Sequence, residues 1–242
     1  MAIVVVGGHS RSVGKTSVVA SLIARLPQRN WTACKITQFG HGFCSANGEP
    51  CDCQTDEHTI AISAERDPKT GTDTARFLAA GAVRSLWVRT RIGNLADAMP
   101  RIRREIEAAE NFIIESNSVL RFLRPDLYLT VLDHATADFK ESARLFLDRA
   151  DAVLLRDSGK DLTPHWSQVS LKLVAGKPRF LIAPPGLVGD DLVAFVEQGL
   201  ATAATADPLR SPGFPVETRG VDGLHAALLR RAAHVDVVSG AK

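Results

Sequence analysis

With 242 residues, of which 45% are hydrophobic and 23% charged, the chain has enough apolar material for the core of one large α/β domain. The formal net charge of +2 at pH 7 gives no electrostatic reason to expect nucleic acid or an anionic membrane as the main partner. The N-terminal apolar run is too short for a signal-peptide core or a membrane span, and no later segment is long enough, so we expect a cytoplasmic protein.

Short apolar segments alternate with helical patterns along the chain. The predicted strands are Ala2–Val6, Trp31–Ile36, Val83–Val88, Asn111–Glu115, Leu127–Leu132, Ala152–Leu155 and Arg179–Ile182. The predicted helices are Thr16–Leu26, a short helix capped by Thr72 or Asp73 that ends at Gly81, Leu95–Glu110, Glu141–Arg149, Asp190–Ala204 and Leu224–Val235. Pro100 should kink or split its helix. Continuous apolar strands alternating with helices indicate an α/β fold, with a mostly parallel sheet covered on both faces.

Two stretches lack a periodic pattern. Residues 38 to 58 are rich in Gly, Cys, Asn, Pro and Asp, and a loop of this length inside a compact domain is usually functional or disordered. Residues 206 to 220 are proline-rich and predict an irregular excursion. We therefore expect one domain over residues 1–242, with a cysteine-containing insertion loop at about 38–58.

The segment "IVVVGGHSRSVGKTS", Ile3 to Ser17, places a glycine-rich loop between a buried strand and a helix. In a phosphate-binding loop, backbone N–H groups wrap the phosphates at a helix N-terminus and a lysine reaches the outer phosphates. The helix dipole contributes only about 0.3–2 kcal/mol, so Lys15 and a Mg²⁺ bound by Thr16 should balance much of the charge. The alternative is a turn that binds nothing. The predicted nucleotide-binding residues are Gly8, Ser10, Arg11, Ser12, Val13, Gly14, Lys15, Thr16 and Ser17.

The spacing of the glycines departs from the usual G-x-x-x-x-G-K-[ST] pattern. That pattern would put a glycine at position 9, where His9 stands, whereas Gly8 leaves five residues before Gly14. The spacing resembles the loop of dethiobiotin synthetases, which read G-x-D-x-x-V-G-K-T. Those enzymes belong to the SIMIBI group of P-loop NTPases, with the nickel-insertion GTPases and the ParA-like ATPases. The resemblance implies a nucleotide site of a variant type.

Charged residues lie at the ends of the second and fourth predicted strands. Lys35 lies in "ACKITQFGHG", where SIMIBI proteins commonly direct a lysine at the substrate or the phosphates; a surface lysine is the alternative. "NFIIES" ends in Glu115, where a carboxylate can hold Mg²⁺ or its waters, unless it is simply solvated. Asn117 and Ser118 follow as candidate substrate contacts. We predict Lys15, Lys35 and Glu115 to be catalytic, and Thr16 and Glu115 to bind Mg²⁺.

The stretch "GTDTARFLAAGAVRSLWVRT", together with these residues, resembles molybdopterin-guanine dinucleotide biosynthesis protein B. The matching positions are Lys15, Thr16, Lys35, Asp73, Ala80, Gly81, Ala82 and Glu115, in the first half of the chain. The resemblance implies an accessory role in molybdenum-cofactor biosynthesis, places Asp73 at the nucleotide, and implies a homodimer with nucleotide at the interface. No N-K-x-D guanine signature occurs in "LLRDSG", Leu154 to Gly159, so ATP and GTP both stay open.

All four cysteines lie within one 20-residue window. In a reducing cytoplasm such clustering indicates metal or redox chemistry more than disulfides. Thiolates this close repel one another, and Zn²⁺ or an iron–sulfur cluster would neutralise them. The candidate ligands are Cys34, Cys44, Cys51 and Cys53, with His41 or His58 as alternatives to Cys34. The competing interpretations are free thiols, redox-active thiols, a Cys34 buried as a small hydrophobe, and solvated loop histidines. Because side chains alternate along a strand, Cys34 and Lys35 should face opposite sides of the sheet.

The sequence thus predicts a nucleoside-triphosphate-binding, slowly hydrolysing accessory protein in metal-cofactor biosynthesis or handling. Its partners would be the nucleotide, a cofactor precursor or a client metalloenzyme, and the γ-phosphate would reorder the loop at 38–58. One alternative is a dethiobiotin-synthetase-like ATP-dependent ligase, which the loop spacing favours. The other is a metal-binding chaperone or sensor in which hydrolysis is a timer.

Overall fold

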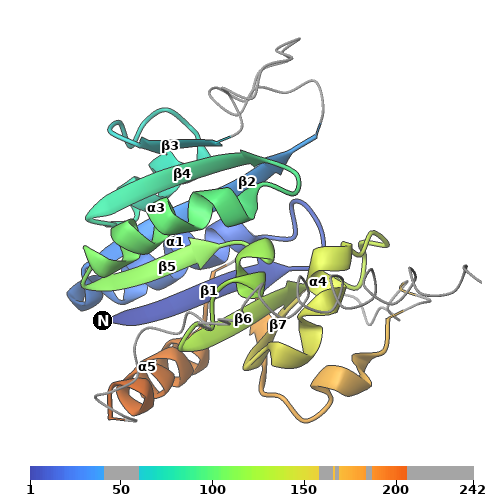
Figure 1. Cartoon of the computed structure of the whole chain (residues 1–242). Coiled ribbons are helices and arrows are strands. Elements are labelled where there is room, and N and C mark those ends of the chain that lie inside the picture. Colours follow the sequence, from blue (N-terminus) through green and yellow to red (C-terminus); the bar gives the residue numbers. More distant parts are fainter. Residues whose placement is uncertain (41–59, 158–165, 167–168, 184–186, 206–242) are drawn as a thin grey trace, which may run out of the picture.

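A computed structural model describes residues 1–40, 60–157, 166, 169–183 and 187–205. In these ranges eight strands form one sheet in the order β3-β4-β2-β5-β1-β6-β7-β8 (Figure 1). The strands are β1 (Ala2–Gly8), β2 (Trp31–Phe39), β3 (Ile60–Ala64), β4 (Arg84–Arg91), β5 (Asn111–Glu115), β6 (Leu127–Leu132), β7 (Ala152–Arg156) and β8 (Arg179–Ile182). The helices are α1 (Lys15–Arg25), α2 (Asp73–Ala79), α3 (Leu95–Glu107), α4 (Glu141–Leu145) and α5 (Asp190–Thr205).

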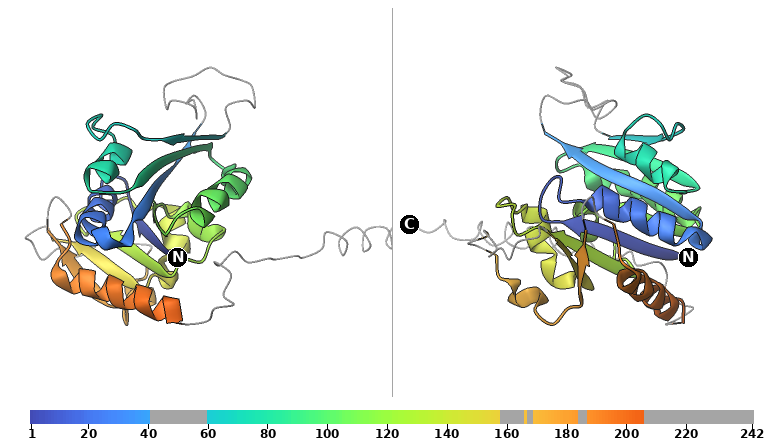
Figure 2. Two further views of the ribbon diagram at one scale, coloured as in Figure 1. Left: turned by 90° about the vertical axis from the view of Figure 1, so that its left-hand side faces the viewer. Right: turned by 180° about the vertical axis from the view of Figure 1, so that it is seen from behind.

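The sheet is parallel except at one edge, where β3 pairs antiparallel with β4. Its two faces are covered by different helices (Figure 2). One apolar cluster joins α1, α2 and α5 to the sheet, and a second joins α3 and the turns after β5 to the other face. The predicted fold class, an α/β fold with a mostly parallel and doubly covered sheet, is confirmed.

The strand β1 lies inside the sheet, between β5 and β6. Its side chains alternate between the two cores: Val4 and Val6 join the cluster beneath α1, whereas Ile3 and Val5 join the cluster beneath α3. A strand buried on both faces reads as a continuous apolar run, and this explains the sequence at the N-terminus. The carboxyl ends of β1, β2, β5 and β6 therefore meet at one edge, where loops can hold a ligand.

Several element predictions differ from the structure. The strand β3 was not predicted, because its five residues carry little pattern: four are half-buried and Ala64 is exposed. Pro100 does not split its helix, since α3 runs unbroken from Leu95 to Glu107 and buries five apolar side chains. The helix predicted over Glu141–Arg149 is shorter: α4 ends at Leu145 and a 3₁₀ turn follows.

The predicted helix Leu224–Val235 lies outside the described residues. In the part of the chain that the structure describes, no helix is long and apolar enough to cross a membrane.

Candidate phosphate-binding site

The glycine-rich loop runs from the end of β1 to the first residue of α1. Gly14 forms the N-cap of α1 with a φ of 102°, a left-handed conformation that favours glycine. Gly8 is required for space instead, because a Cβ there would lie 2.9 Å from Cγ2 of Val13 and 3.0 Å from the Lys15 side chain. Val13 is buried and fixes the loop to the core. The predicted order of buried strand, loop and helix is confirmed.

His9 occupies the position where the usual pattern has glycine, and its side chain leaves the loop. It is fully buried; its Nδ1 lies 2.7 Å from the Asp138 carbonyl, and its Nε2 accepts the Asp133 backbone N–H at 3.0 Å. Because Nε2 is an acceptor, the imidazole is neutral with its proton on Nδ1. Burial lowers the pKa of His9, which favours the same neutral form. The ring packs against Phe139 and Trp166, with centroids 5.2 and 4.8 Å away.

The backbone at position 9 explains why glycine is not required there. The described non-glycine residues with positive φ are Ser12 and Asn30, so His9 adopts a backbone conformation open to any L-residue. Its N–H donates to the Val131 carbonyl at 3.1 Å, and its carbonyl accepts the Lys140 N–H at 2.7 Å. The loop is therefore tied to β6 and to residues 133–140, which follow β6.

Ser10, Arg11 and Ser12 form the part of the loop farthest along the chain from both β1 and α1. The Ser10 hydroxyl donates to Asp138 Oδ2 at 2.6 Å, which adds a side-chain bond to the same segment after β6. Arg11 and Ser12 are exposed, and Ser12 has a φ of 56°.

Lys15 and Thr16 open α1 and direct polar groups toward the loop and β5. The Lys15 ammonium donates to the Ser10 carbonyl at 2.5 Å, across the loop. Burial lowers the pKa of Lys15 to about 8, although Glu115 opposes the shift. The Thr16 hydroxyl donates to Glu115 Oε2 at 2.7 Å, which joins the start of α1 to the end of β5.

Lys35 and Glu115 are brought together by strand register. They are directly paired positions on the parallel strands β2 and β5, and Lys35 Nζ lies 3.0 Å from Glu115 Oε1. Lys35 also forms an ion pair with Asp73 and lies 3.5 Å from the Thr16 hydroxyl. Burial would lower the pKa of Lys35, but Glu115 and Asp73 together outweigh it and the pKa is raised. The charged ammonium is therefore the stable form.

Asp73 reaches this cluster from α2, whose first residue it is. Of the two caps that the sequence allowed, Thr72 and Asp73, it is Thr72 that caps the helix, by accepting the Ala75 N–H at 3.0 Å. Arg76, one turn later, donates to the Ser17 hydroxyl at 2.8 Å and so joins α2 to α1. These contacts fix the direction from which the Asp73 carboxylate approaches Lys35.

Asn117, a candidate substrate contact by sequence, holds the loop backbone in the structure. Its Oδ1 accepts the Gly8 N–H at 2.9 Å and its Nδ2 donates to the Gly8 carbonyl at 2.8 Å. A Cβ on Gly7 would lie only 2.2 Å from the same Oδ1, so the double contact requires glycine at position 7. Ser118 begins the 3₁₀ turn Ser118–Arg121. Sequence reasoning missed this role because a side-chain amide that binds a distant backbone group leaves no recognisable spacing in the sequence.

The oxygen atoms around Lys35 suit a small divalent cation. The Thr16 hydroxyl and the carboxylates of Asp73 and Glu115 all contact the Lys35 ammonium, so a positive charge already lies among them. Hydroxyl and carboxylate oxygens are the donors that Mg²⁺ prefers. The donor set therefore fits the predicted ion.

The cysteine prediction is only partly covered by the described residues. Cys44, Cys51, Cys53, His41 and His58 lie outside them. Cys34 and Lys35 face opposite sides of β2, as predicted, and Cys34 is buried in the core beneath α3. Burial raises the pKa of this thiol, which opposes the thiolate that a metal requires. Among the described residues no group of three His, Cys, Asp or Glu side chains could hold a metal ion.

The fold and the loop together define an α/β P-loop architecture: a central parallel strand, a G-K-T loop and a helix, with an acid at the end of the neighbouring strand. No protein-family model matches the chain, and no curated protein matches it significantly.

Three solved structures resemble the fold. HypB from Helicobacter pylori in complex with nickel is 16% identical over 83% of this chain and 87% of its own, with a TM-score of 0.43. An apo-form LpxK from Aquifex aeolicus in complex with ATP is 19% identical over 75% and 53%, with a TM-score of 0.44. A Zn(II)-bound triple mutant of the YjiA GTPase is 16% identical over 79% and 60%, with a TM-score of 0.38.

Proposed function

We propose that the protein binds a nucleoside triphosphate with Mg²⁺ in this loop and hydrolyses it slowly. The observation that carries the proposal is the 2.7 Å contact between the Thr16 hydroxyl and Glu115, next to a loop that Lys15 spans. A hydroxyl at the start of a helix and a carboxylate at a strand end are the two protein groups that hold Mg²⁺ in P-loop NTPases. Titration of the protein with each nucleotide distinguishes ATP from GTP as the ligand.

Each polar side chain has a role in this proposal. Thr16 and Glu115 would hold Mg²⁺, which neutralises phosphate charge when bound. Lys15 would turn from the Ser10 carbonyl to the outer phosphates, and its pKa would rise on contact with them. Lys35 would stabilise charge that develops on the phosphoryl group during hydrolysis, since it is fully charged and lies beside Glu115. Asp73 would set the position of Lys35.

The biological role that we propose is that of an accessory protein in metal-cofactor biosynthesis, of the molybdenum-cofactor type. It rests on the sequence resemblance alone. Lys35 lies four residues before the end of β2, from which the chain enters the cysteine-containing loop at about 38–58. A nucleotide whose phosphates bind the Lys35 ammonium would therefore reorder this loop. We propose that Cys44, Cys51 and Cys53 bind zinc or an iron–sulfur cluster there, and that the protein acts as a homodimer on a cofactor precursor or client metalloenzyme.

The metal part of the proposal has its own test. Protein made with iron and zinc supplied and purified without oxygen should contain stoichiometric metal, and its thiols should react fully only after denaturation. Metal-free protein in which the thiols of Cys44, Cys51 and Cys53 react freely in the native state would remove the cysteine site and leave the nucleotide site intact; the buried Cys34 is expected to react only after denaturation in either case.

A ligase resembling dethiobiotin synthetase is the second candidate. Five residues separate Gly8 from Gly14, and the two glycines of the dethiobiotin synthetase loop have the same spacing. Phosphate release by such an enzyme depends on its carboxylate or amine substrate. Slow phosphate release from nucleotide and Mg²⁺ alone, unaffected by small acids and amines, would favour the accessory NTPase.

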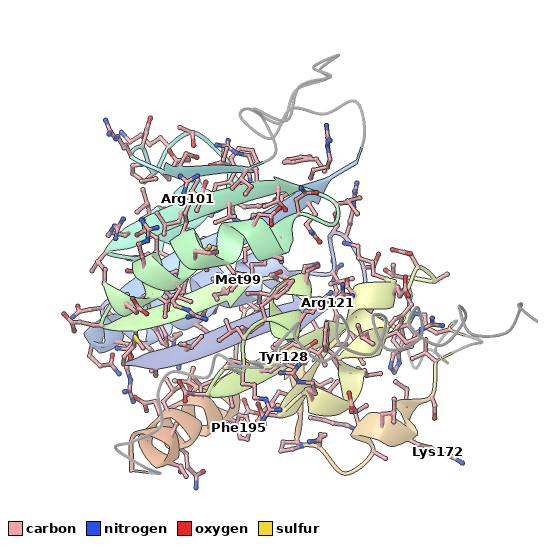
Figure 3. The ribbon with its side chains drawn as sticks, in the orientation of Figure 1. Met99, Arg101, Arg121, Tyr128, Lys172 and Phe195 are labelled. Atoms are coloured by element: carbon pink, nitrogen blue, oxygen red, sulfur yellow. The ribbon has the colours of Figure 1, made fainter. Side chains whose placement is uncertain are left out.

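Lys15→Ala tests the nucleotide site. We expect affinity for Mg²⁺-ATP or Mg²⁺-GTP to fall at least about 100-fold, or about 2.7 kcal/mol, because the loop loses its main phosphate cation. Lys172→Ala is the matched control, since Lys172 is an exposed lysine away from the loop (Figure 3). Titration calorimetry gives the affinities and circular dichroism checks the fold. Equal affinities in both variants and wild type would show that the loop is a structural turn.

A further inference from the structure

Lys140 is a fourth cation near the phosphate loop that sequence reasoning did not single out. Its backbone N–H donates to the His9 carbonyl at 2.7 Å, and its own carbonyl accepts the N–H groups of Ala143 and Arg144 at 3.0 and 3.1 Å. The main chain of Lys140 is thereby fixed on one side to the loop and on the other to α4. The side chain of Lys140 therefore starts from a fixed point beside the loop.

The Lys140 side chain is half-buried, and both cations and carboxylates act on it. Burial and the neighbouring Arg11 are the largest influences and lower its pKa, as does Lys35, whereas Asp138 and Glu115 raise it by less than these lower it. Lys15, for its part, has its pKa lowered by Lys140. Lys140 therefore interacts electrostatically with Arg11, Lys15 and Lys35.

The carboxylates of this region are engaged elsewhere. Asp73 and Glu115 pair with Lys35, and Asp138 accepts the Ser10 hydroxyl at 2.6 Å. Among the described residues, no carboxylate lies within ion-pair distance of the Lys140 ammonium, and its side chain makes no hydrogen bond. Half-burying an unpaired ammonium beside other cations costs free energy, which an anion bound at this place would recover.

We propose that Lys140 is a phosphate-positioning residue, whose ammonium pairs with the outer phosphates of the bound nucleotide from the β6 side of the loop. Lys35 stands on the β2 side, so the polyphosphate would lie between two cations in addition to Lys15. This inference rests on the proposed nucleotide site and adds to it a contact from a separate segment. The anchor of that segment is His9, so the residue that replaces glycine in the loop also places the extra cation.

The test compares Lys140→Gln, Lys140→Arg and the control Lys172→Ala. Binding of inorganic tripolyphosphate and of Mg²⁺-ATP and Mg²⁺-GTP is measured by calorimetry at low and high salt, with melting temperatures recorded for each variant. Tripolyphosphate has no base or sugar, so it isolates the phosphate contacts. Lys140→Gln keeps most of the side-chain stem and removes the charge, which limits any loss of folding.

We expect Lys140→Gln to weaken tripolyphosphate about tenfold, equivalent to about 1.4 kcal/mol, and to flatten the salt dependence. Lys140→Arg should keep most of the affinity, and Lys172→Ala all of it. Wild-type affinity in Lys140→Gln, or a loss that Lys140→Arg does not restore, would overturn the inference. If Lys15→Ala abolishes binding while Lys140→Gln does not, the inference fails and the nucleotide site stands. If wild type binds none of the three ligands, both fail.

Discussion

The two sides of the phosphate loop are built on different chemistry. On the β2 and β5 side, Lys35, Asp73 and Glu115 form a network of full charges around the Thr16 hydroxyl. On the β6 side, a neutral His9 is held by backbone groups of the segment 133–140 and packs against aromatic rings. The ion pairs of the first side could be exchanged for bonds to a ligand, whereas on the second side both ring nitrogens of His9 already have hydrogen-bond partners.

The two sides are expected to contribute to different properties of the protein, one to stability and the other to hydrolysis. Ion pairs at a partly open site contribute little net stability, because desolvation and screening offset the attraction. Buried neutral groups with satisfied hydrogen bonds contribute mainly by what their removal would leave unpaired. We therefore expect substitutions on the β6 side to reduce stability most, and those on the charged side to reduce hydrolysis most.

The largest expected effect is that of His9→Ala on stability. The variant leaves the Asp133 N–H and the Asp138 carbonyl without their partner and opens a cavity beside Trp166. Together these should lower the free energy of unfolding by about 3 kcal/mol. Asp73→Ala is the matched change on the charged side, and should lower it by less than about 1 kcal/mol because Asp73 is 40% exposed. Urea unfolding measures both, and a larger loss for Asp73→Ala would contradict the comparison.

Next in size is the effect of Glu115→Gln on hydrolysis. The variant keeps the size of the side chain but weakens its hold on Mg²⁺, which matters more as charge shifts in the transition state. We expect nucleotide affinity to stay within about tenfold of wild type and the hydrolysis rate to fall by more than that. Single-turnover phosphate release measures the rate apart from binding. Equal losses in affinity and rate would show that Glu115 supports binding only.

The smallest effect is a pH dependence of stability that comes from His9. Its pKa in the folded protein lies below the ordinary value of 6.5, so below that pH the unfolded chain takes up a proton that the folded protein refuses. Stability should therefore fall as pH drops below about 6.5, by at most about 1.4 kcal/mol per pH unit, and this contribution should be flat above it. Urea unfolding of wild type and the non-titrating His9→Gln between pH 7.5 and 5.5 isolates the contribution. A wild-type stability that falls no faster than that of His9→Gln would contradict it.

The sequence predicted the parts of the site that lie at the ends of strongly patterned elements. The apolar run before Gly8 and the strand ending in Glu115 both give clear signals, because strands buried on two faces read as continuous apolar segments. The direct pairing of Lys35 with Glu115 was beyond reach, since it depends on β2 lying next to β5. Asp73 came from the family resemblance, because a residue at the start of a short helix shows no sign of which strand it will face.

The parts that sequence reasoning missed lie in irregular chain. The segment that holds Asp133, Asp138 and Lys140 has no period, and its contacts are mostly to backbone groups, which any sequence supplies. The double hydrogen bond of Asn117 to Gly8 is invisible for the same reason. Only the tertiary fold brings Asp133, Asp138, Lys140 and Asn117 next to the loop.

The placement of His9 also determines what would be needed to build this site in another protein. In an ordinary P-loop the position of His9 is a glycine, which has no side chain and therefore needs no partners elsewhere in the protein. In this protein the loop at position 9 is fixed by the His9 side chain, whose hydrogen-bond partners lie more than 120 positions away in the sequence. Grafting residues 3–17 onto another α/β protein would thus leave the His9 imidazole without its hydrogen-bond and packing partners. A functional transplant would have to carry the stretch after β6 and the Trp166 ring as well.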